Sequence, residues 1–262
     1  MNKELIIVIG MISIFLATTL GASLVYLFKK EISSKANTVF LGFASGIMIS
    51  ASIWSLLMPA IDQSEDLGKL QLLPAVIGFI LGGVFLVALD KVVPHIHHST
   101  DEEEGIKNHL SKPMKLFLAV TIHNIPEGLA VGFAFGAANM INTEAAILSA
   151  LGLSIGIAVQ NFPEGAALSL PMKSETGSKN KAFLFGALSG IVEPIAAIIG
   201  FFLASYITPL QPWLLSFAAG AMIFVVVEDL IPEAKLEENP HLATWSFMAG
   251  FIVMMILDIT LG

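Results

Sequence analysis

The sequence contains no cysteine and no arginine, and charged residues occupy only 13% of its 262 positions. Soluble domains usually carry about 25% charged residues, so this shortage of charge argues against a water-soluble fold. The absence of cysteine excludes disulfides and thiolate metal sites, which leaves oxygen, imidazole nitrogen or thioether sulfur to hold any metal. What the sequence has instead is 55% hydrophobic residues and a mean hydropathy of +0.82. This composition predicts an integral membrane protein.

The hydrophobic residues are gathered into runs long enough to cross a bilayer, which takes about 20 helical residues. The first run, residues 4–28, is too long for the core of a signal peptide, about 7 to 15 residues, and we interpret it as a retained helix. We therefore predict an all-α fold with eight transmembrane helices in a single domain, residues 1–262. The helices are predicted near residues 4–28, 37–61, 70–93, 115–138, 144–172, 181–206, 210–232 and 241–262.

The lysines, which supply all 13 basic residues, fall mainly at alternate connections between the predicted helices. Two of them, Lys3 and Lys69, lie on one side, and the other eleven lie on the opposite side. The positive-inside rule places the lysine-rich side in the cytoplasm, so both termini are predicted to be extracytoplasmic. The alternation also favours an even number of helices, because one missed span would exchange the sides of all later lysines.

The longest connection, residues 94–114, is predicted on the cytoplasmic side and is rich in histidine and acid. It contains His95, His97, His98, His109, Asp101, Glu102, Glu103 and Glu104. Two interpretations stay open: a solvated linker that its acids keep in water, or a low-affinity collector of metal ions.

Two neighbouring predicted helices carry the same polar phrase, Asn-x-Pro-Glu-Gly, preceded by histidine in the fourth helix and glutamine in the fifth. The first residue lies four before the glutamate and the asparagine three before it, so all three side chains share one helix face. These two faces consist of His123, Asn124 and Glu127, and of Gln160, Asn161 and Glu164. Each proline removes a backbone donor and frees a carbonyl one turn earlier, which bends the helix at its polar side chains.

Ionisable side chains inside a membrane cost a few kcal/mol or more, so each is a functional hypothesis. Glu127, Glu164 and Glu193 lie 9 to 12 residues from the lysines that mark the cytoplasmic ends of their helices, or roughly 14 to 18 Å. They are thus predicted near the middle of a core about 30 Å thick, where transporters commonly place their sites. With no arginine in the chain and no lysine at that depth, metal ions or protons remain as their partners. Matching motifs on oppositely directed neighbours suggest two adjacent ions about a local two-fold axis.

The paired motifs HNIPEGLAVGFAFG and QNFPEGAALSLP resemble the signature of the ZIP (Zrt/Irt-like protein) metal transporters, most of all their bacterial GufA-like branch. The resemblance covers essentially the whole chain and implies a ZIP-type bundle with an inverted repeat and a binuclear metal centre. The implied ligands are His123, Glu127, Gln160 and Glu164 for one ion, and Asn124, Glu127, Asn161, Glu164 and Glu193 for the other. Members of this branch also present a methionine from the second helix, which corresponds to Met48.

The resemblance implies import of divalent metal, zinc first, into the cytoplasm across the plasma membrane, with the ion as substrate and no cofactor. Oxygen and imidazole donors also suit iron, manganese, cobalt and cadmium, so the ligand types leave the metal open. Many relatives have histidine at the position of Gln160, and some have aspartate at that of Asn161, so this site has fewer charged or basic ligands. The expected partners are the ions and the lipid bilayer, with no nucleic acid, and a homodimer would be ordinary.

Three other functions stay open from the sequence alone. A selective channel with the same ligands would differ from a carrier in its motion and not in its residue types. An intramembrane metal-dependent hydrolase usually has more histidine, whereas His123 is the one histidine predicted at bilayer depth, so we expect no enzyme. A carrier of an organic solute would need a binding surface beyond metal-type donors. Glu228 and Asp229, near the cytoplasmic end of the seventh helix, are either an exit station for the ion or interfacial groups.

Overall fold

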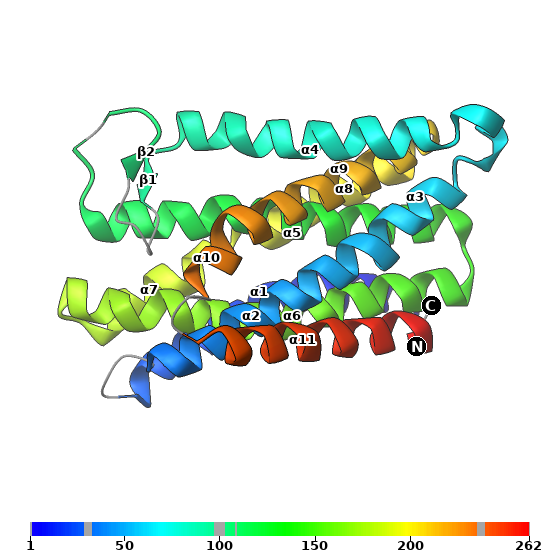
Figure 1. Ribbon diagram of the computed structural model, residues 1–262. Helices are drawn as coiled ribbons and strands as arrows, with labels where there is room; N and C mark the ends of the chain where they lie inside the picture. Colours follow the sequence, from blue (N-terminus) through cyan, green and yellow to red (C-terminus); the bar gives the residue numbers. More distant parts are fainter. Residues whose placement is uncertain (1, 29–32, 97–102, 108, 235–238, 262) are drawn as a thin grey trace.

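The computed structural model describes residues 2–28, 33–96, 103–107, 109–234 and 239–261. Helices that run side by side make up almost all of this part of the chain (Figure 1). The first half contains α1 (Lys3–Ser23), η1 (Leu24–Tyr26), α2 (Ser34–Ala51), η2 (Ser52–Leu57), α3 (Met58–Asp62), η3 (Glu65–Leu70), α4 (Leu72–Val92), β1 (His95–Ile96), β2 (Glu103–Glu104) and α5 (Lys112–Ile141). The second half contains α6 (Glu144–Thr176), α7 (Lys179–Ser189), α8 (Val192–Tyr206), η4 (Thr208–Leu210), α9 (Gln211–Val225), η5 (Val226–Leu230), α10 (Ile231–Glu233) and α11 (Pro240–Leu261).

Eight helical stretches within the described residues are long and apolar enough to cross a membrane. They are Lys3–Tyr26, Ser34–Asp62, Leu72–Val92, Lys112–Ile141, Glu144–Thr176, Lys179–Tyr206, Thr208–Glu233 and Pro240–Leu261. Large apolar side chains cover their outer faces, as Leu16 and Leu20 do on α1, where they are 50% and 60% exposed. Such a surface is stable in lipid and not in water. The prediction of an all-α membrane protein with eight spans is confirmed.

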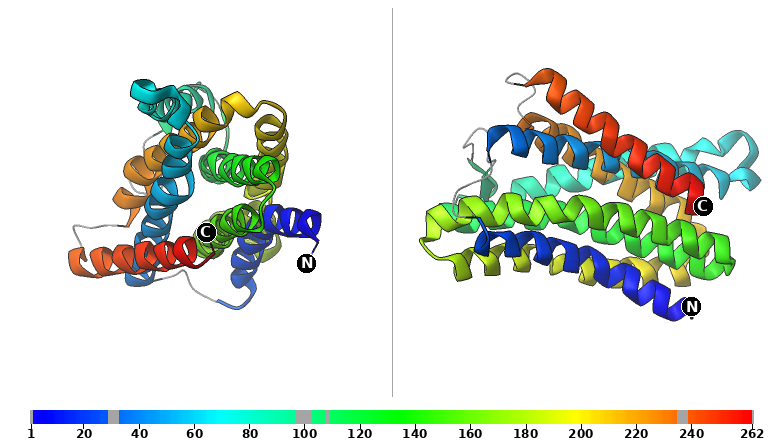
Figure 2. Two further views of the ribbon diagram at one scale, coloured as in Figure 1. Left: turned by 90° about the vertical axis from the view of Figure 1, so that its right-hand side faces the viewer. Right: turned by 90° about the horizontal axis from the view of Figure 1, so that it is seen from below.

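The two helices that carry the polar motifs, α5 and α6, are joined by a tight turn. Asn142 ends α5 in the left-handed conformation, with φ 58°, which asparagine tolerates better than most residues. Thr143 then caps α6, because its hydroxyl accepts a hydrogen bond from the Ala146 amide at 3.3 Å. The short turn makes α5 and α6 antiparallel neighbours, and in an end-on view they lie together in the middle of the bundle (Figure 2).

Glycines bring the helices together in four close pairs: α5 with α8, α1 with α6, α2 with α11, and α4 with α9. On α5, the glycines recur every fourth residue and meet the backbone of α8 along one face. Small residues at this spacing let membrane helices approach closely without a side chain between them. The glycines of the four contacts are Gly128, Gly132 and Gly136; Gly21 and Gly165; Gly42, Gly46 and Gly250; and Gly78, Gly82 and Gly220.

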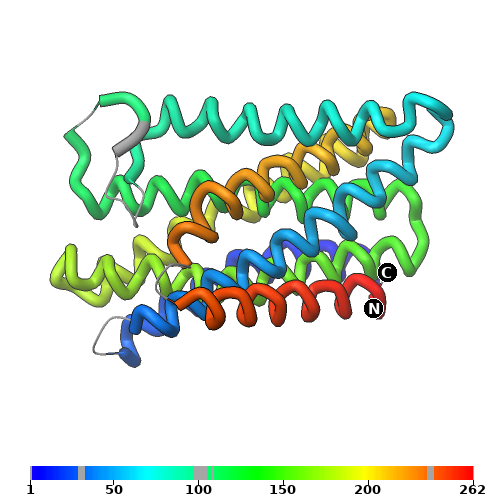
Figure 3. Tube along the Cα trace, viewed as in Figure 1, coloured from blue at the N-terminus to red at the C-terminus, as the bar shows by residue number. Residues whose placement is uncertain are grey.

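Both termini lie at the same end of the bundle, beside the turn between α5 and α6 (Figure 1). The connection between α4 and α5 and the turn between α6 and α7 lie at the opposite end, as the chain trace shows (Figure 3). The lysines of those two connections therefore gather at the end away from the termini. This arrangement is the one that an even number of membrane crossings requires.

Three of the spans contain breaks in regular α-helix. The sixth span is interrupted at Gly190 and Ile191, so that α8 begins anew in the middle of the bundle. The second and seventh spans each contain a π-helical segment, η2 and η5, and each segment is followed two residues later by a proline, Pro59 or Pro232. Prolines disturb the helical hydrogen-bond ladder, and π-segments are frequent at functional sites.

The connection between α4 and α5 is folded in part. Strand β1 pairs with β2 in antiparallel register, with His95 opposite Glu104. The side chain of His95 is buried, unlike the exposed His109, so the start of this connection is enclosed. His97, His98, Asp101 and Glu102, which the metal-collector interpretation also needs, lie outside the described residues.

Candidate metal centre

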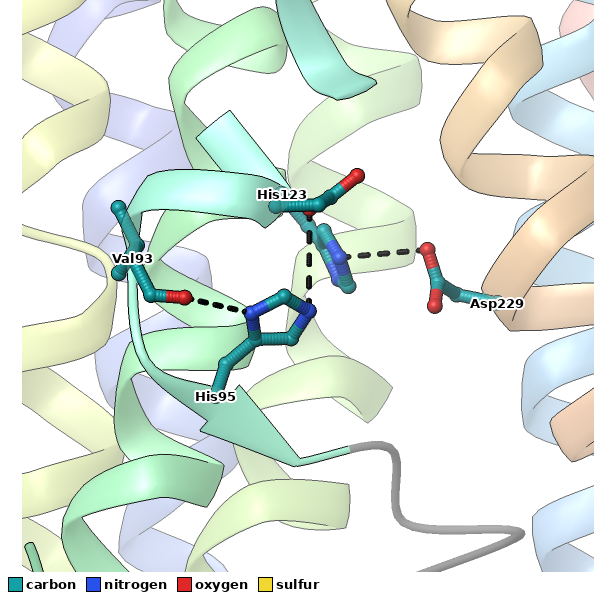
Figure 4. A network of polar contacts seen from close by, with 5 residues as sticks. Val93, His95, His123 and Asp229 are labelled. Atoms are coloured by element: carbon teal, nitrogen blue, oxygen red, sulfur yellow. Dashed lines mark hydrogen bonds and ion pairs between the residues drawn. The ribbon is translucent and has the colours of Figure 1, made fainter. Parts of the chain in front are cut away.

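The first motif lies in the central part of α5. Asn124 and Glu127 are buried there, with 0% and 2% of their surfaces exposed. The ring of His123 contacts the seventh span, where its Nε2 atom lies 3.2 Å from Oδ2 of Asp229 (Figure 4). Helix periodicity alone predicts His123 above Glu127, whereas the structure places its imidazole against the carboxylate of Asp229 on η5.

The second motif lies opposite, on α6. Gln160 and Asn161 are fully buried, while Glu164 is half-buried. The side-chain amide of Gln160 donates to Oε1 of Glu127 at 2.6 Å and also to Oδ1 of Asn161. Both protons of this amide are thus used, and the two motifs are joined across the α5–α6 interface.

Glu193 completes this network from the first turn of α8. Its fully buried carboxylate accepts hydrogen bonds from Nδ2 of Asn124 at 3.1 Å and from Nδ2 of Asn161 at 2.9 Å. A third bond comes from the hydroxyl of Thr18 on α1, at 2.8 Å. Four helices, α1, α5, α6 and α8, therefore contribute to one buried network, defined here as Thr18, Asn124, Glu127, Gln160, Asn161 and Glu193.

The glycine of each motif explains how these four helices approach so closely. A side chain on Gly128 would collide with the backbone of α8 at Glu193, whose Cα would lie 2.9 Å from the added Cβ. A side chain on Gly165 would collide in the same way with the backbone carbonyl of Thr18 on α1. Each Pro-Glu-Gly phrase thus pairs a buried carboxylate with the glycine that admits the next helix of the network.

Three acceptor atoms of the network have no hydrogen-bond partner among the residues that the structure describes: Oδ1 of Asn124, Oε2 of Glu127 and Oε1 of Gln160. A buried polar atom without a partner costs about 1–3 kcal/mol, and native proteins tolerate few of them. In this network every such atom is an oxygen that can accept a hydrogen bond or bind a cation. These donor atoms fit a divalent cation with oxygen ligands.

The remaining predicted ligands are not joined to this network. The carboxylate of Glu164 forms no hydrogen bond or ion pair within the described chain, and Met48 is fully buried in the apolar core. No three histidine, aspartate or glutamate side chains among the described residues converge closely enough to hold a metal ion.

A second polar group lies beside His123, between the fourth and seventh spans. Asp229 is buried, whereas its neighbour Glu228 is exposed, so of the two acids Asp229 contacts the interior. His95 hydrogen-bonds the carbonyl of Val93 through Nδ1 at 2.9 Å, and its Nε2 atom lies 3.7 Å from Oδ1 of Asp90 (Figure 4). Sequence reasoning did not single out His95 within its loop, because four histidines there look alike.

Eight apolar helices around a buried cluster of carboxylates and amides define a multi-pass membrane protein with a polar centre. A family model described as ZIP Zinc transporter matches residues 4–115 and 113–258. The chain belongs to this family.

Relatives of full length support the assignment. Zinc transporter ZIP11 of Xenopus tropicalis is 36% identical, with 94% of this chain and 94% of that protein covered. Zinc transporter GufA of Myxococcus xanthus is 35% identical, with 94% and 95% covered, and zinc transporter ZIPB of Bordetella bronchiseptica is 34% identical, with 97% and 81% covered. The predicted resemblance to ZIP transporters and their GufA-like branch is confirmed.

Proposed function

We propose that this chain carries divalent metal ions, zinc first among them, into the cytoplasm through the polar centre between α5 and α6. The whole of residues 1–262 acts as one transmembrane domain in the plasma membrane, with both termini outside the cell. The observation that carries the proposal is the set of three unpartnered oxygens on Asn124, Glu127 and Gln160, which are cation ligands by chemistry. The lysine-rich end of the bundle is the cytoplasmic one.

Two ions occupy the centre in this proposal, and the motif glutamates bridge them. The ligands are His123, Glu127, Gln160 and Glu164 for one ion, and Asn124, Glu127, Asn161, Glu164 and Glu193 for the other, with Met48 as a further ligand of the centre. Each amide carries a donor and an acceptor on one carbon, so a half-turn of the side chain replaces an N–H by a carbonyl oxygen. Gln160 and the two asparagines can therefore release the carboxylates they now hold and bind the incoming ion.

The ion then leaves toward the cytoplasm past His123 and Asp229. The contact between these two residues joins the motif helix α5 to η5, and it offers an imidazole and a carboxylate as the next ligands. Asp229 is the exit residue, because it is buried beside His123 while Glu228 is exposed. The chain alternates between a form open to the outside and a form open to the cytoplasm, and each ion moves during that change. It acts as a carrier with no enzymatic activity.

Uptake of radioactive zinc into proteoliposomes tests this function. Glu127→Gln should abolish saturable uptake, because the variant removes the carboxylate that would bind the ion and keeps the size of the side chain. Glu144→Gln is the matched control, since this glutamate is exposed in the first turn of the same helix pair, and it should transport as the native chain does.

Competition by manganese, iron, cobalt and cadmium ranks the ions in the same assay. Flux that saturates and falls steeply on cooling indicates a carrier, whereas flux that rises linearly with zinc indicates a channel. Two results would contradict the proposal. One is native protein that moves no zinc across the proteoliposome membrane, and the other is Glu127→Gln that transports zinc as the native chain does.

A further inference from the structure

The carboxylate of Glu193 is held by three donors that differ in what else they can do. Asn124 and Asn161 donate through their amide groups, and Thr18 donates through a hydroxyl. The two asparagines are ligands of the second ion in the function proposed above. Once their carbonyl oxygens turn to the ion, their amide protons no longer point at Glu193. The hydroxyl of Thr18 is then the donor of this set that stays on the carboxylate.

The position of Thr18 is fixed by the packing of its own backbone. Gly165 on α6 leaves room for the carbonyl of Thr18, and a Cβ on Gly190 would lie 2.9 Å both from Cβ of Thr18 and from Oε1 of Glu193. Thr18 is fully buried. The close contacts at Gly165 and Gly190 thus fix the place of Thr18, with its hydroxyl beside Glu193.

The hydroxyl of Thr18 has two acceptors within reach but only one proton. Oε1 of Glu193 lies at 2.8 Å and the backbone carbonyl of Ile14 at 3.2 Å. In the described geometry the carboxylate is the nearer acceptor, and the shorter hydrogen bond goes to Glu193. The Ile14 carbonyl is the usual alternative for a threonine in a helix and keeps the hydroxyl paired when Glu193 is displaced.

We infer that Thr18 is a positioning residue for Glu193: its hydroxyl orients the carboxylate toward the second ion and so sets the affinity of that ion. The inference rests on the proposed function, since it assigns Thr18 a role behind a ligand and not in contact with the metal. Hydrogen-bond partners of metal ligands typically change metal affinity by about 10- to 100-fold when they are removed. The expected effect of losing this hydroxyl is of that size.

Zinc titration of the purified full chain, followed by calorimetry, tests the inference. Thr18→Val keeps the shape of threonine and removes the hydroxyl, and it should weaken one of two zinc sites by about 10- to 100-fold. Thr18→Ser keeps the hydroxyl and should restore most of the affinity. The control is Thr19→Val, one residue along the same helix, because the Thr19 hydroxyl has no hydrogen-bond partner among the described residues. This control should bind zinc as the native chain does.

A second comparison separates positioning from a structural role. In the Glu193→Ala background, Thr18→Val should cause no further loss of zinc affinity, because alanine leaves the Thr18 hydroxyl no carboxylate to orient. In transport, Thr18→Val should raise the KM for zinc and leave the maximal rate nearly unchanged. If the valine variant does not fold, Thr18→Ser and Thr18→Ala form another pair that differs by the hydroxyl alone.

The outcomes distinguish this inference from the proposed function. Native protein that binds no zinc would overturn both. A different result would overturn the role of Thr18 and leave the proposed function standing. In that result the native protein binds two zinc ions, and Thr18→Val binds them with the native affinity. Thr18→Ala takes the place of Thr18→Val if the valine variant does not fold. Equal losses of zinc affinity in Thr18→Val and Thr19→Val would also overturn the role of Thr18. Loss of the unpartnered Thr19 hydroxyl would then have the same effect as loss of the hydroxyl bonded to Glu193.

Discussion

Two groups of helices share one packing device but differ in the chemistry they bury. In the first group, α1, α5, α6 and α8, glycines bring the helices together around the six-residue network of amides and carboxylates. In the second group, α2, α4, α9 and α11, glycines produce equally close backbone contacts, but mostly apolar side chains surround them, with the Ser216 hydroxyl bonded to the carbonyl of Pro74 between α9 and α4. Close packing by glycine therefore does not make a site. The glycines set the spacing of the helices, and a site forms only where hydrogen-bond donors and acceptors line the space between them.

One polar contact between the two groups lies beside the metal centre. The pair His123 and Asp229 links α5 of the first group to η5 of the second group's seventh span. The hydrogen bond between Ser55 and Asp258 lies instead within the second group's spans. A carrier that exposes its site alternately to both sides must let two parts of the bundle move relative to each other, and a contact that joins the two groups has to change during that motion.

The largest effect is expected from alanine at a glycine of each group. Gly128→Ala and Gly46→Ala both place a methyl group against backbone and should each lower the free energy of unfolding by about 1–3 kcal/mol. Only Gly128→Ala should also weaken zinc binding, since its neighbour is Glu193. Gly83→Ala is the control, because its Cβ would make an ordinary contact of 3.6 Å with Phe224. Thermal melts and zinc titrations in detergent measure both quantities.

Equal zinc affinity in folded Gly128→Ala and Gly46→Ala would contradict the difference between the two groups. It would mean that the site depends on general packing and not on the contact at Glu193.

A smaller effect is expected at the contact between the groups. Asp229→Asn removes the charge next to His123 and keeps the shape, so it should slow zinc transport by about tenfold, the loss expected for one charge-assisted hydrogen bond. Zinc affinity of the central site should not fall, because the ring of His123 must leave Asp229 before it can bind the central ion. The check is a comparison of transport rate with equilibrium zinc binding in the same preparation. A variant that loses binding and transport in parallel would place Asp229 within the central site and not on the exit path.

The sequence predicted the eight spans and identified the two motifs, because hydrophobic run length, lysine position and repeated polar residues are local signals. It could not predict how His123 turns, since that depends on Asp229, which is more than a hundred residues away in the chain. Thr18 was missed for the same reason: its partner Glu193 is 175 positions distant, and a threonine in an apolar helix is unremarkable by itself. The role of the motif glycines likewise needed the neighbouring helices.

The central claim is that zinc binds between α5 and α6 at the three unpartnered oxygens. Anomalous diffraction at the zinc absorption edge, from crystals of the full chain grown with zinc, tests this most directly. The account predicts two peaks within coordination distance of Glu127, one of them also beside Gln160 and the other beside Asn124 and Glu193. Peaks confined to Asp90, His95 and the connection before α5, with none between the two motifs, would contradict it.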